Sequence, residues 1–345
     1  MKIKLALGAK LAPQFLEQIK PFCQVRLVGN QADGEKTGLF EQCMGSEIIY
    51  LSSETADRAC LTQWKQAGLQ LLGCARSNPV NIDTRAAKEL DIPLVYCPGR
   101  NAQSVAELTI ALLLCAARNV HIAWQNLQNG ALLADAQPDI YHLASQKDVV
   151  WRDDRIFVRD IVPQGTELYE KTLGLVGFGA IGSRVCGLAQ AFDMRVLVYD
   201  PYCSETHIQQ GGATPCTLPE LWQQADFVSL HLPVNQTTEG MVNEQWFSAM
   251  KPSACLINTS RAALVDQQDL VHALRTGQIA GAAMDVMWKE PCPKNHPLLA
   301  MPTFLLTPHI GGWTDGVELW QSRMIADEII RYAKGEPPLR LWKNG

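Results

Sequence analysis

The stretch KTLGLVGFGAIGSRVCGLAQAFDMRVLVYDP, residues 171–201, decides the fold of this chain. It begins with Leu173–Phe178, a run of apolar residues and glycine that is typical of a strand buried on both faces. A glycine-rich turn and an amphipathic helical pattern follow, and a second apolar run, Arg195–Tyr199, ends at Asp200. The order of strand, glycine turn, helix and strand predicts a βαβ unit in a parallel α/β sheet.

The glycine-rich turn, GFGAIG at 177–182, has the spacing of a dinucleotide-binding loop. The first glycine allows a tight turn, the second lets the backbone approach a pyrophosphate, and the third lets the helix pack closely on the strand. A GxGxxG turn alone is weak evidence, but here Asp200 stands 18 positions after Gly182, where a carboxylate accepts hydrogen bonds from an adenosine ribose. We therefore predict NAD as the cofactor, bound by Gly177, Gly179, Ala180, Ile181, Gly182 and Asp200.

Composition and charge narrow the class of protein. At 345 residues, of which 47% are hydrophobic and 19% charged, the chain is long enough for two globular domains. The net charge of −5 gives no electrostatic argument for binding nucleic acid or an anionic membrane. The longest apolar run, Leu108–Ala117, is too short to span a bilayer. The 11 cysteines are scattered, with no CxxC and no Cys/His ligand spacing, which predicts reduced thiols, no metal site and a cytoplasmic location.

Strand and helix patterns alternate in both halves of the chain, which predicts two doubly wound parallel sheets. No glycine-rich phosphate loop occurs before Pro98, so the N-terminal half is not the dinucleotide site. The last helix, Asp315–Lys334, is expected to cross back to the N-terminal unit, and residues 337–345 are expected to be a tail. The expected strands are 3–7, 24–28, 47–51, 69–74 and 94–97 in the first half and 173–178, 195–199, 226–230, 254–258, 280–286 and 304–307 in the second.

These patterns predict a discontinuous N-terminal domain, residues 1–102 plus 311–345, and an NAD-binding domain, residues 103–310. The apolar segment 104–123 predicts one long helix, with Ser104 as its N-cap and Glu107 completing a capping box. Residues 124–170 then form a long irregular connection. A connection of this length is often functional, and a lid, an oligomer arm and a solvated excursion are all open, with the arm favoured.

Three polar residues follow strands of the second half, at the end where open α/β sheets place ligands. They are Arg261, Glu290 and His309. A guanidinium can hold a carboxylate, an imidazole can exchange a hydroxyl proton near neutrality, and a carboxylate beside the imidazole fixes its tautomer. Together with a dinucleotide, these groups predict interconversion of a 2-hydroxy acid and a 2-oxo acid.

With these motifs the sequence resembles the D-isomer-specific 2-hydroxyacid dehydrogenase family, which includes phosphoglycerate, glycerate, lactate and formate dehydrogenases. The motifs, in the family's order, are PGRNAQSVAE at 98–107, GFGAIG at 177–182, HLP at 231–233, NTSR at 258–261, Asp285 with Glu290-Pro291, and TPHIGG at 307–312. The resemblance implies a flavodoxin-like substrate-binding domain, a Rossmann NAD-binding domain and a homodimer formed through the latter. It also implies that Arg261, Glu290 and His309 are catalytic, that Asp285 holds the nicotinamide amide, and that Ser260, Gly311 and Gly312 bind the cofactor.

The sequence departs from the family pattern in two places. Ala262 stands where a glycine usually follows the catalytic arginine, which is a mild change. In the loop Arg76–Asn81, RSNPVN replaces a glycine-containing loop whose amides hold the substrate carboxylate in the family. Extra guanidinium groups at the strand ends suggest a phosphorylated or sugar-derived acid. The residues expected to contact substrate are Arg76, Ser77, Asn78, Arg100 and Asn101; alternatively, both arginines point to solvent or pair with carboxylates such as Asp83.

Other readings of the same residues stay open. A non-enzymatic dinucleotide sensor or corepressor-like protein on the same fold is an alternative, although the full Arg/Glu/His set argues against it. A formate-type enzyme is a weaker alternative, because the resemblance implies a Gln–His pair in that branch, whereas this chain has Glu290 and His309. His296 is a rival imidazole that we expect to be surface structure, and His231 is expected either to line the cofactor site or to make a structural hydrogen bond.

Overall fold

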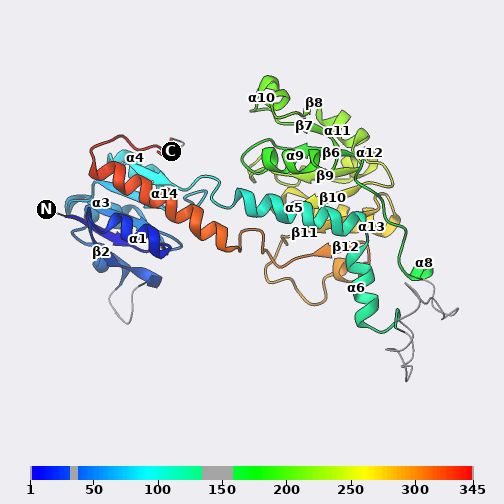
Figure 1. The fold of residues 1–345 in the computed structure, drawn as a ribbon, viewed down its shortest axis with the longest axis horizontal. Helices are drawn as coiled ribbons and strands as arrows, with labels where there is room; N and C mark the ends of the chain where they lie inside the picture. The colour runs from blue at the N-terminus through cyan, green and yellow to red at the C-terminus, as the bar shows by residue number, and fades with distance from the viewer. Residues whose placement is uncertain (1, 32–37, 134–157, 344–345) are drawn as a thin grey trace, which may run out of the picture. The chain divides into compact units, whose positions relative to one another are not determined.

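Two parallel sheets organise the chain, as the computed structural model shows for residues 2–31, 38–133 and 158–343 (Figure 1). Each sheet belongs to one of two units. Unit 1 comprises Met1–Ser104 with Gly312–Gly345, and unit 2 comprises Val105–Gly311. The sequence placed the two breaks after residues 102 and 310. The α/β class with two doubly wound sheets is confirmed.

The sheet of unit 1 has the order β2-β1-β3-β4-β5, with every pair parallel. This is the flavodoxin-like order, in which the direction of winding reverses between β1 and β3. All residues of β3 and β4 are buried, as expected for central strands covered on both faces. The strands are β1 Ile3–Leu7, β2 Cys23–Leu27, β3 Ile48–Leu51, β4 Leu71–Cys74 and β5 Leu94–Tyr96, which confirms the five predicted ones.

Helix α14, Asp315–Ala333, lies beside α1, Pro13–Ile19, in unit 1 (Figure 1). The Ala12 N–H donates to Ser322 Oγ at 2.8 Å, and Gln321 Nε2 donates to the Lys10 carbonyl oxygen at 3.1 Å. The predicted return of the last helix to the N-terminal unit is thereby confirmed. The other helices of this unit are η1 Gly29–Gln31, α2 Leu39–Cys43, α3 Arg58–Gln66 and α4 Thr84–Glu89.

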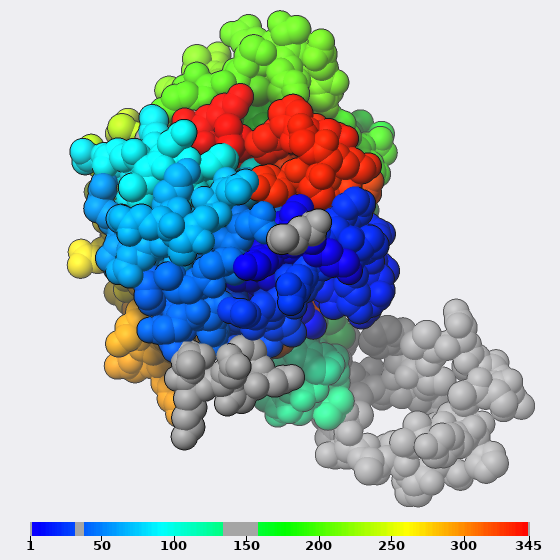
Figure 2. Space-filling model, turned by 90° about the vertical axis from the view of Figure 1, so that its left-hand side faces the viewer, coloured from blue at the N-terminus to red at the C-terminus, as the bar shows by residue number. Residues whose placement is uncertain are grey.

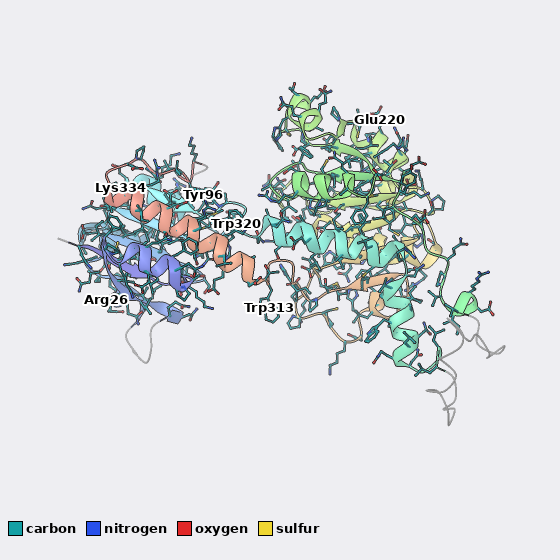
Figure 3. The ribbon with its side chains drawn as sticks, in the orientation of Figure 1. Arg26, Tyr96, Glu220, Trp313, Trp320 and Lys334 are labelled. Carbon is teal, nitrogen blue, oxygen red and sulfur yellow. The ribbon has the colours of Figure 1, made fainter. Side chains whose placement is uncertain are left out.

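The C-terminal segment is not the free tail that the sequence suggested. Leu341 pairs with Val95 in an antiparallel bridge, and the segment therefore covers the edge of β5. The buried Glu328 carboxylate accepts from the Arg340 N–H at 3.0 Å and from Arg340 Nη1 at 2.9 Å, which anchors the segment to α14. The red C-terminal residues accordingly lie against the cyan surface of this unit in Figure 2. Tyr96, labelled in Figure 3, meets the Trp342 ring edge-on at 5.1 Å between centroids.

The sheet of unit 2 has the order β12-β11-β10-β9-β6-β7-β8, again entirely parallel. This is the Rossmann order, with its reversal between β6 and β9. The edge strand β8, Thr214–Pro215, was not predicted, because two residues carry no readable pattern. The other strands confirm the six predictions: β6 Thr172–Val176, β7 Arg195–Tyr199, β9 Phe227–Leu230, β10 Cys255–Asn258, β11 Gly281–Met284 and β12 Phe304–Leu306.

The prediction of one helix over 104–123 is wrong. Helix α5 spans Ala102–Ala117, so Ser104 lies inside its first turn and not at its N-cap. Asn119, at φ 53°, then breaks the helix, and α6 runs over Val120–Gln128. The left-handed conformation of Asn119 is one that asparagine tolerates and that an apolar pattern does not reveal. The remaining helices of unit 2 are α8 Val158–Ile161, α9 Gly182–Gln190, α10 Glu205–Gln210, α11 Leu218–Gln224, α12 Glu244–Ala249, η2 Ala262–Leu264, α13 Gln267–Thr276 and η3 Pro297–Ala300.

The irregular connection expected over 124–170 falls largely in 134–157, outside the described residues. Its interpretation as a lid, an oligomer arm or a solvated excursion therefore stays a prediction. Within the described parts of the chain, no single helix is long and apolar enough to cross a membrane; α5 and α6 pass that test only as a pair, and they meet at a bend of 70°.

Candidate active site

The glycine turn between β6 and α9 lies at the reversal point of the unit 2 sheet. Gly177 has φ +102°, and a Cβ there would lie 2.4 Å from the His231 carbonyl oxygen. A Cβ at Gly182 would lie 2.2 Å from the Gly177 carbonyl oxygen. No heavy atom lies within 4 Å of a Cβ built on Gly179. The first and last glycines are thus required by the turn itself, while the middle one leaves open space, as a pyrophosphate needs.

Asp200 connects the end of β7 to this turn. Its Oδ2 accepts from the Phe178 N–H at 2.7 Å, and its Oδ1 accepts from the Tyr202 N–H at 2.9 Å. Each carboxylate oxygen can accept a further hydrogen bond, so the group fits an adenosine ribose. Ala180 is exposed and Ile181 is half-buried in the same turn.

His231, directly after β9, makes a structural hydrogen bond. Its Nε2 lies 2.9 Å from Ser229 Oγ, and its buried Nδ1 has no partner among the described residues. Burial lowers the pKa of His231 to about 4, so its ring is neutral at physiological pH. The side chain is therefore uncharged, and its Cβ would lie 3.7 Å from a Cβ built on Gly182.

Arg261, Glu290 and His309 follow three neighbouring strands, β10, β11 and β12. The structure brings Glu290 and His309 into contact: His309 Nδ1 lies 2.7 Å from Glu290 Oε2. Burial of the Glu290 carboxyl acts to raise its pKa, but the hydrogen bonds from His309 and from the Met287 N–H outweigh it, with help from the charge of Arg261, so the pKa lies below its usual range. Glu290 is accordingly a carboxylate at neutral pH.

The turn that carries Arg261 is fixed by the buried Asn258. Asn258 Nδ2 donates to the Arg261 carbonyl oxygen at 2.9 Å, and Asn258 Oδ1 accepts from the Ser260 N–H at 3.0 Å. Ser260 Oγ in turn donates to the Leu232 carbonyl oxygen at 2.6 Å, which joins this turn to the one after β9. Arg261 Nη1 donates to the Ser260 carbonyl oxygen at 2.7 Å.

Asp285, expected from the resemblance to hold the nicotinamide amide, grips the His309 loop in this structure. Its Oδ1 accepts from Thr307 Oγ1 at 2.6 Å and from the Ile310 N–H at 2.9 Å, and its Oδ2 accepts from the Gly311 N–H at 2.7 Å. His309 has φ 57°, which costs about 1–2 kcal/mol in a residue with a side chain. Hydrogen bonds to a charged group contribute roughly 1.5–3 kcal/mol each, so the three together outweigh that cost.

The sequence did not reveal this use of Asp285. Asp285 is 1% exposed, and a buried carboxylate needs hydrogen-bond donors. An acidic residue within an apolar run of the sequence was therefore the available sign that Asp285 holds another part of the chain. Its cofactor role stays a prediction, as do those of Ser260, Gly311 and Gly312. Gly311 is buried in unit 2, whereas Gly312 is exposed in unit 1.

The residues expected to contact substrate follow β4 and β5 in unit 1. Ser77 Oγ donates to Asn101 Oδ1 at 3.2 Å, and Asn78 is exposed. Arg100 Nη1 donates to Oε1 of the buried Gln321, a contact that no sequence pattern indicated. Burial lowers the pKa of Arg100, and the nearby charge of Arg76 adds to this effect.

The alternative in which these arginines pair with a carboxylate such as Asp83 is wrong. Asp83 accepts from the Ala86 N–H at 2.8 Å and caps α4. No ion pair of Arg76 or Arg100 with a carboxylate occurs within residues 2–31, 38–133 and 158–343. Unit 1 therefore holds two close guanidinium groups that lack such an acidic partner.

A cavity of about 420 Å³ lies beside the Glu290–His309 pair in unit 2. Apart from that pair its walls carry no charged side chain. They are formed by Met287, Glu290, Pro291, Cys292, Leu306, Thr307, Pro308 and His309. His296, the rival imidazole, is not part of this wall; it caps η3.

Comparison with known proteins agrees with this architecture. Residues 110–311 match the family described as D-isomer specific 2-hydroxyacid dehydrogenase, NAD binding domain. The Bacillus subtilis protein YoaD, assigned to the 2-hydroxyacid dehydrogenases, is 34% identical over 86% of this chain and 82% of its own length. D-3-phosphoglycerate dehydrogenase of Methanocaldococcus jannaschii is 33% identical over 87% of this chain, which spans only 52% of that enzyme. The crystal structure of TT0316 from Thermus thermophilus is 29% identical, with a TM-score of 0.75 over 99% of this chain and 100% of that one.

This chain belongs to the D-isomer specific 2-hydroxyacid dehydrogenase family and is an NAD-dependent oxidoreductase of that class. The predicted cofactor is confirmed by the NAD binding domain that unit 2 matches almost end to end. The open space at Gly179 and the Asp200 carboxylate fit that cofactor.

Asp200 should make the enzyme prefer NADH to NADPH, because a carboxylate repels a 2′-phosphate and Pro201-Tyr202 supplies no cation. We expect kcat/KM to be higher with NADH by about tenfold or more, equivalent to ~1.4 kcal/mol. The control is Asp200→Asn, which keeps an oxygen for the Phe178 N–H and removes the charge, and which should reduce the ratio. A wild-type preference for NADPH would contradict the assignment.

Proposed function

We propose that the protein interconverts a D-2-hydroxy acid and its 2-oxo acid, with Arg261, Glu290 and His309 as the catalytic residues. The observation that carries the proposal is the 2.7 Å contact between His309 Nδ1 and Glu290 Oε2, made at the end of the sheet where Arg261 also follows a strand. These three residue types meet the needs of a substrate that has a carboxylate and a neighbouring hydroxyl.

His309 is the proposed acid–base group. Because Glu290 is ionised, it accepts the Nδ1 proton and leaves Nε2 as the nitrogen that faces the substrate oxygen. In oxidation, Nε2 takes the hydroxyl proton, and the resulting positive imidazole is stabilised by Glu290. In reduction, Nε2 returns the proton to the oxygen at C2. NAD, when bound, supplies the hydride acceptor at its nicotinamide ring.

Arg261 is proposed to hold the substrate carboxylate. Its guanidinium presents several N–H donors in one plane and can grip two carboxylate oxygens together. The Asn258 side chain fixes the backbone on both sides of the peptide that links Ser260 to Arg261, so the arginine side chain extends from a fixed backbone. Holding the carboxylate fixes C2 relative to His309, and such orientation is a major part of catalysis.

We further propose that the substrate carries a second anionic or polyhydroxylated part, which binds Arg76 and Arg100. The supporting observation is that these two guanidinium groups lie close together in unit 1 without an acidic partner among the described residues. A simple monocarboxylate gives no reason for so much positive charge. The non-enzymatic sensor is not favoured, because a binding protein has no use for the Glu290–His309 pair.

A homodimer formed through unit 2 is also proposed. Helix α6 exposes Val120, Trp124 and Leu127 at spacings of four and three residues, which place them on one face. Trp124 is 61% exposed, and an apolar stripe of this kind is typical of an interface. The mass of the protein in solution tests this proposal.

The 11 free cysteines suit the proposed cytoplasmic location.

Replacing His309 should nearly abolish turnover. His309→Ala removes the proton-transfer group, and we expect kcat to fall by about 10²-fold or more. NADH binding, followed by fluorescence, should be unchanged, because the glycine turn is untouched. A near-normal kcat in this variant would make His296 the candidate and would contradict the proposal.

Replacing Glu290 should change the pH dependence. In reduction His309 must be protonated, and the negative charge of Glu290 favours that form. Glu290→Gln keeps the shape and removes the charge, so the alkaline limb of the kcat profile should move to lower pH. A profile that coincides with that of the wild type would show that Glu290 does not act through His309.

Arg76→Ala tests the substrate class. It should raise KM for a phosphorylated 2-oxo acid such as 3-phosphohydroxypyruvate by about tenfold or more, which corresponds to the loss of one charge-assisted hydrogen bond. KM for glyoxylate should change little. Arg85→Ala is the matched control, since that exposed arginine on α4 pairs with Glu89. Equal effects on both acids, or none, would mean that Arg76 carries no substrate charge.

A further inference from the structure

The segment that carries Glu290 lacks regular secondary structure. It runs from Asp285, just after β11, to His296, just before η3, and no helix or strand lies between them. Glu290 itself holds the backbone nearby, since its Oε1 accepts from the Met287 N–H at 3.0 Å. Toward β12, however, Met287, Glu290 and Pro291 line the cavity of about 420 Å³. Close packing on that side is therefore incomplete, and the place of Glu290 depends on its two hydrogen bonds and on how the segment is held at its ends.

Trp288 supplies one anchor. Its Nε1 donates to the Val265 carbonyl oxygen at 3.0 Å. Its ring lies parallel to that of His296, with 6.2 Å between centroids and 7° between planes. Trp288 stands two residues before Glu290, and its half-buried indole contacts both Val265 and His296.

His296 supplies the second anchor, at the other end of the segment. Its Nδ1 accepts from the N–H of the buried Leu298 at 3.3 Å and caps η3. With Nδ1 accepting, the neutral ring carries its proton on Nε2, which lies 3.0 Å from Gln267 Nε2; the two side chains form a hydrogen bond when the Gln267 amide turns its oxygen toward the ring. A ring that accepts at Nδ1 must be neutral, and burial, which lowers the pKa of His296, favours that form.

Both anchors end on the same piece of chain. Val265 and Gln267 lie directly after η2, the short helix that begins at the residue following Arg261. The segment that holds the carboxylate partner of His309 is therefore tied to the segment that holds the substrate-gripping arginine. These ties are independent of the Glu290–His309 contact itself.

We propose that His296, acting with Trp288, is a positioning residue that sets the place of Glu290 relative to Arg261. The inference rests on the proposed function, since it assigns His296 a task only if Glu290 and Arg261 are catalytic. His296 touches neither reacting atoms nor the catalytic pair; it acts through the loop. A displacement of about 1 Å at a catalytic group can cost about 10²-fold in rate.

The test measures kcat, NADH affinity and the pH profile of His296→Ala. We expect kcat to fall by about tenfold or more while NADH affinity stays unchanged, and the alkaline limb to move in the same direction as in Glu290→Gln. The double variant that combines His296→Ala with Glu290→Gln should have a kcat no lower than that of Glu290→Gln alone. Both changes act on the same interaction, the support of His309 by Glu290. His272→Ala, an exposed histidine on α13, is the matched control and should behave as wild type.

A second variant covers loss of folding. His296→Asn keeps a side-chain acceptor for the Leu298 N–H and loses the ring on Trp288, so it should fold and show an intermediate kcat. A wild-type kcat and pH profile in both variants would overturn the inference, as would additive losses in the double variant. If Glu290→Gln and His309→Ala themselves had no effect, the proposed function would fail instead, so the two failures are distinguishable.

Discussion

The candidate active site depends on the contact between His309 Nδ1 and Glu290 Oε2. Neither residue lies in a helix or strand, and they are brought together only because β11 and β12 are parallel neighbours whose carboxyl ends meet at one edge. The left-handed backbone at His309 is held by the buried Asp285, which grips the chain before and after it. The sheet thus supplies the place, and a buried carboxylate supplies the exact conformation.

The sequence was most informative where a local pattern is also the physical cause. The apolar runs predicted all six strands that flank or carry the site, because strands buried on both faces consist mostly of apolar residues. The glycines at 177 and 182 could be read correctly because each is demanded by a contact that any side chain would break. The Glu290 and His309 pairing could likewise be expected from two strand ends and the chemistry of the two groups.

The sequence was least informative where the contact joins distant parts of the chain. No pattern near Arg100 predicts its hydrogen bond to Gln321, and no pattern near the C-terminus predicts the bridge between Leu341 and Val95. The break between α5 and α6 depends on the backbone of Asn119, inside a run that reads as continuous helix. Asp285 was expected from the resemblance to hold the nicotinamide amide, but its hydrogen-bond donors in this structure follow the neighbouring strand β12. Such contacts follow from the fold, and a local pattern carries no record of them.

The tautomer of the His309 ring reports directly on its contact with Glu290. In protein labelled with ¹⁵N at histidine, the chemical shifts of the two ring nitrogens report which one carries the proton of the neutral ring. Because Glu290 accepts the Nδ1 proton, we expect a protonated Nδ1 and a bare Nε2 in the wild type, and a loss of this preference in Glu290→Ala. A neutral ring protonated at Nε2 in the wild type, or the same tautomer with and without Glu290, would contradict this expectation.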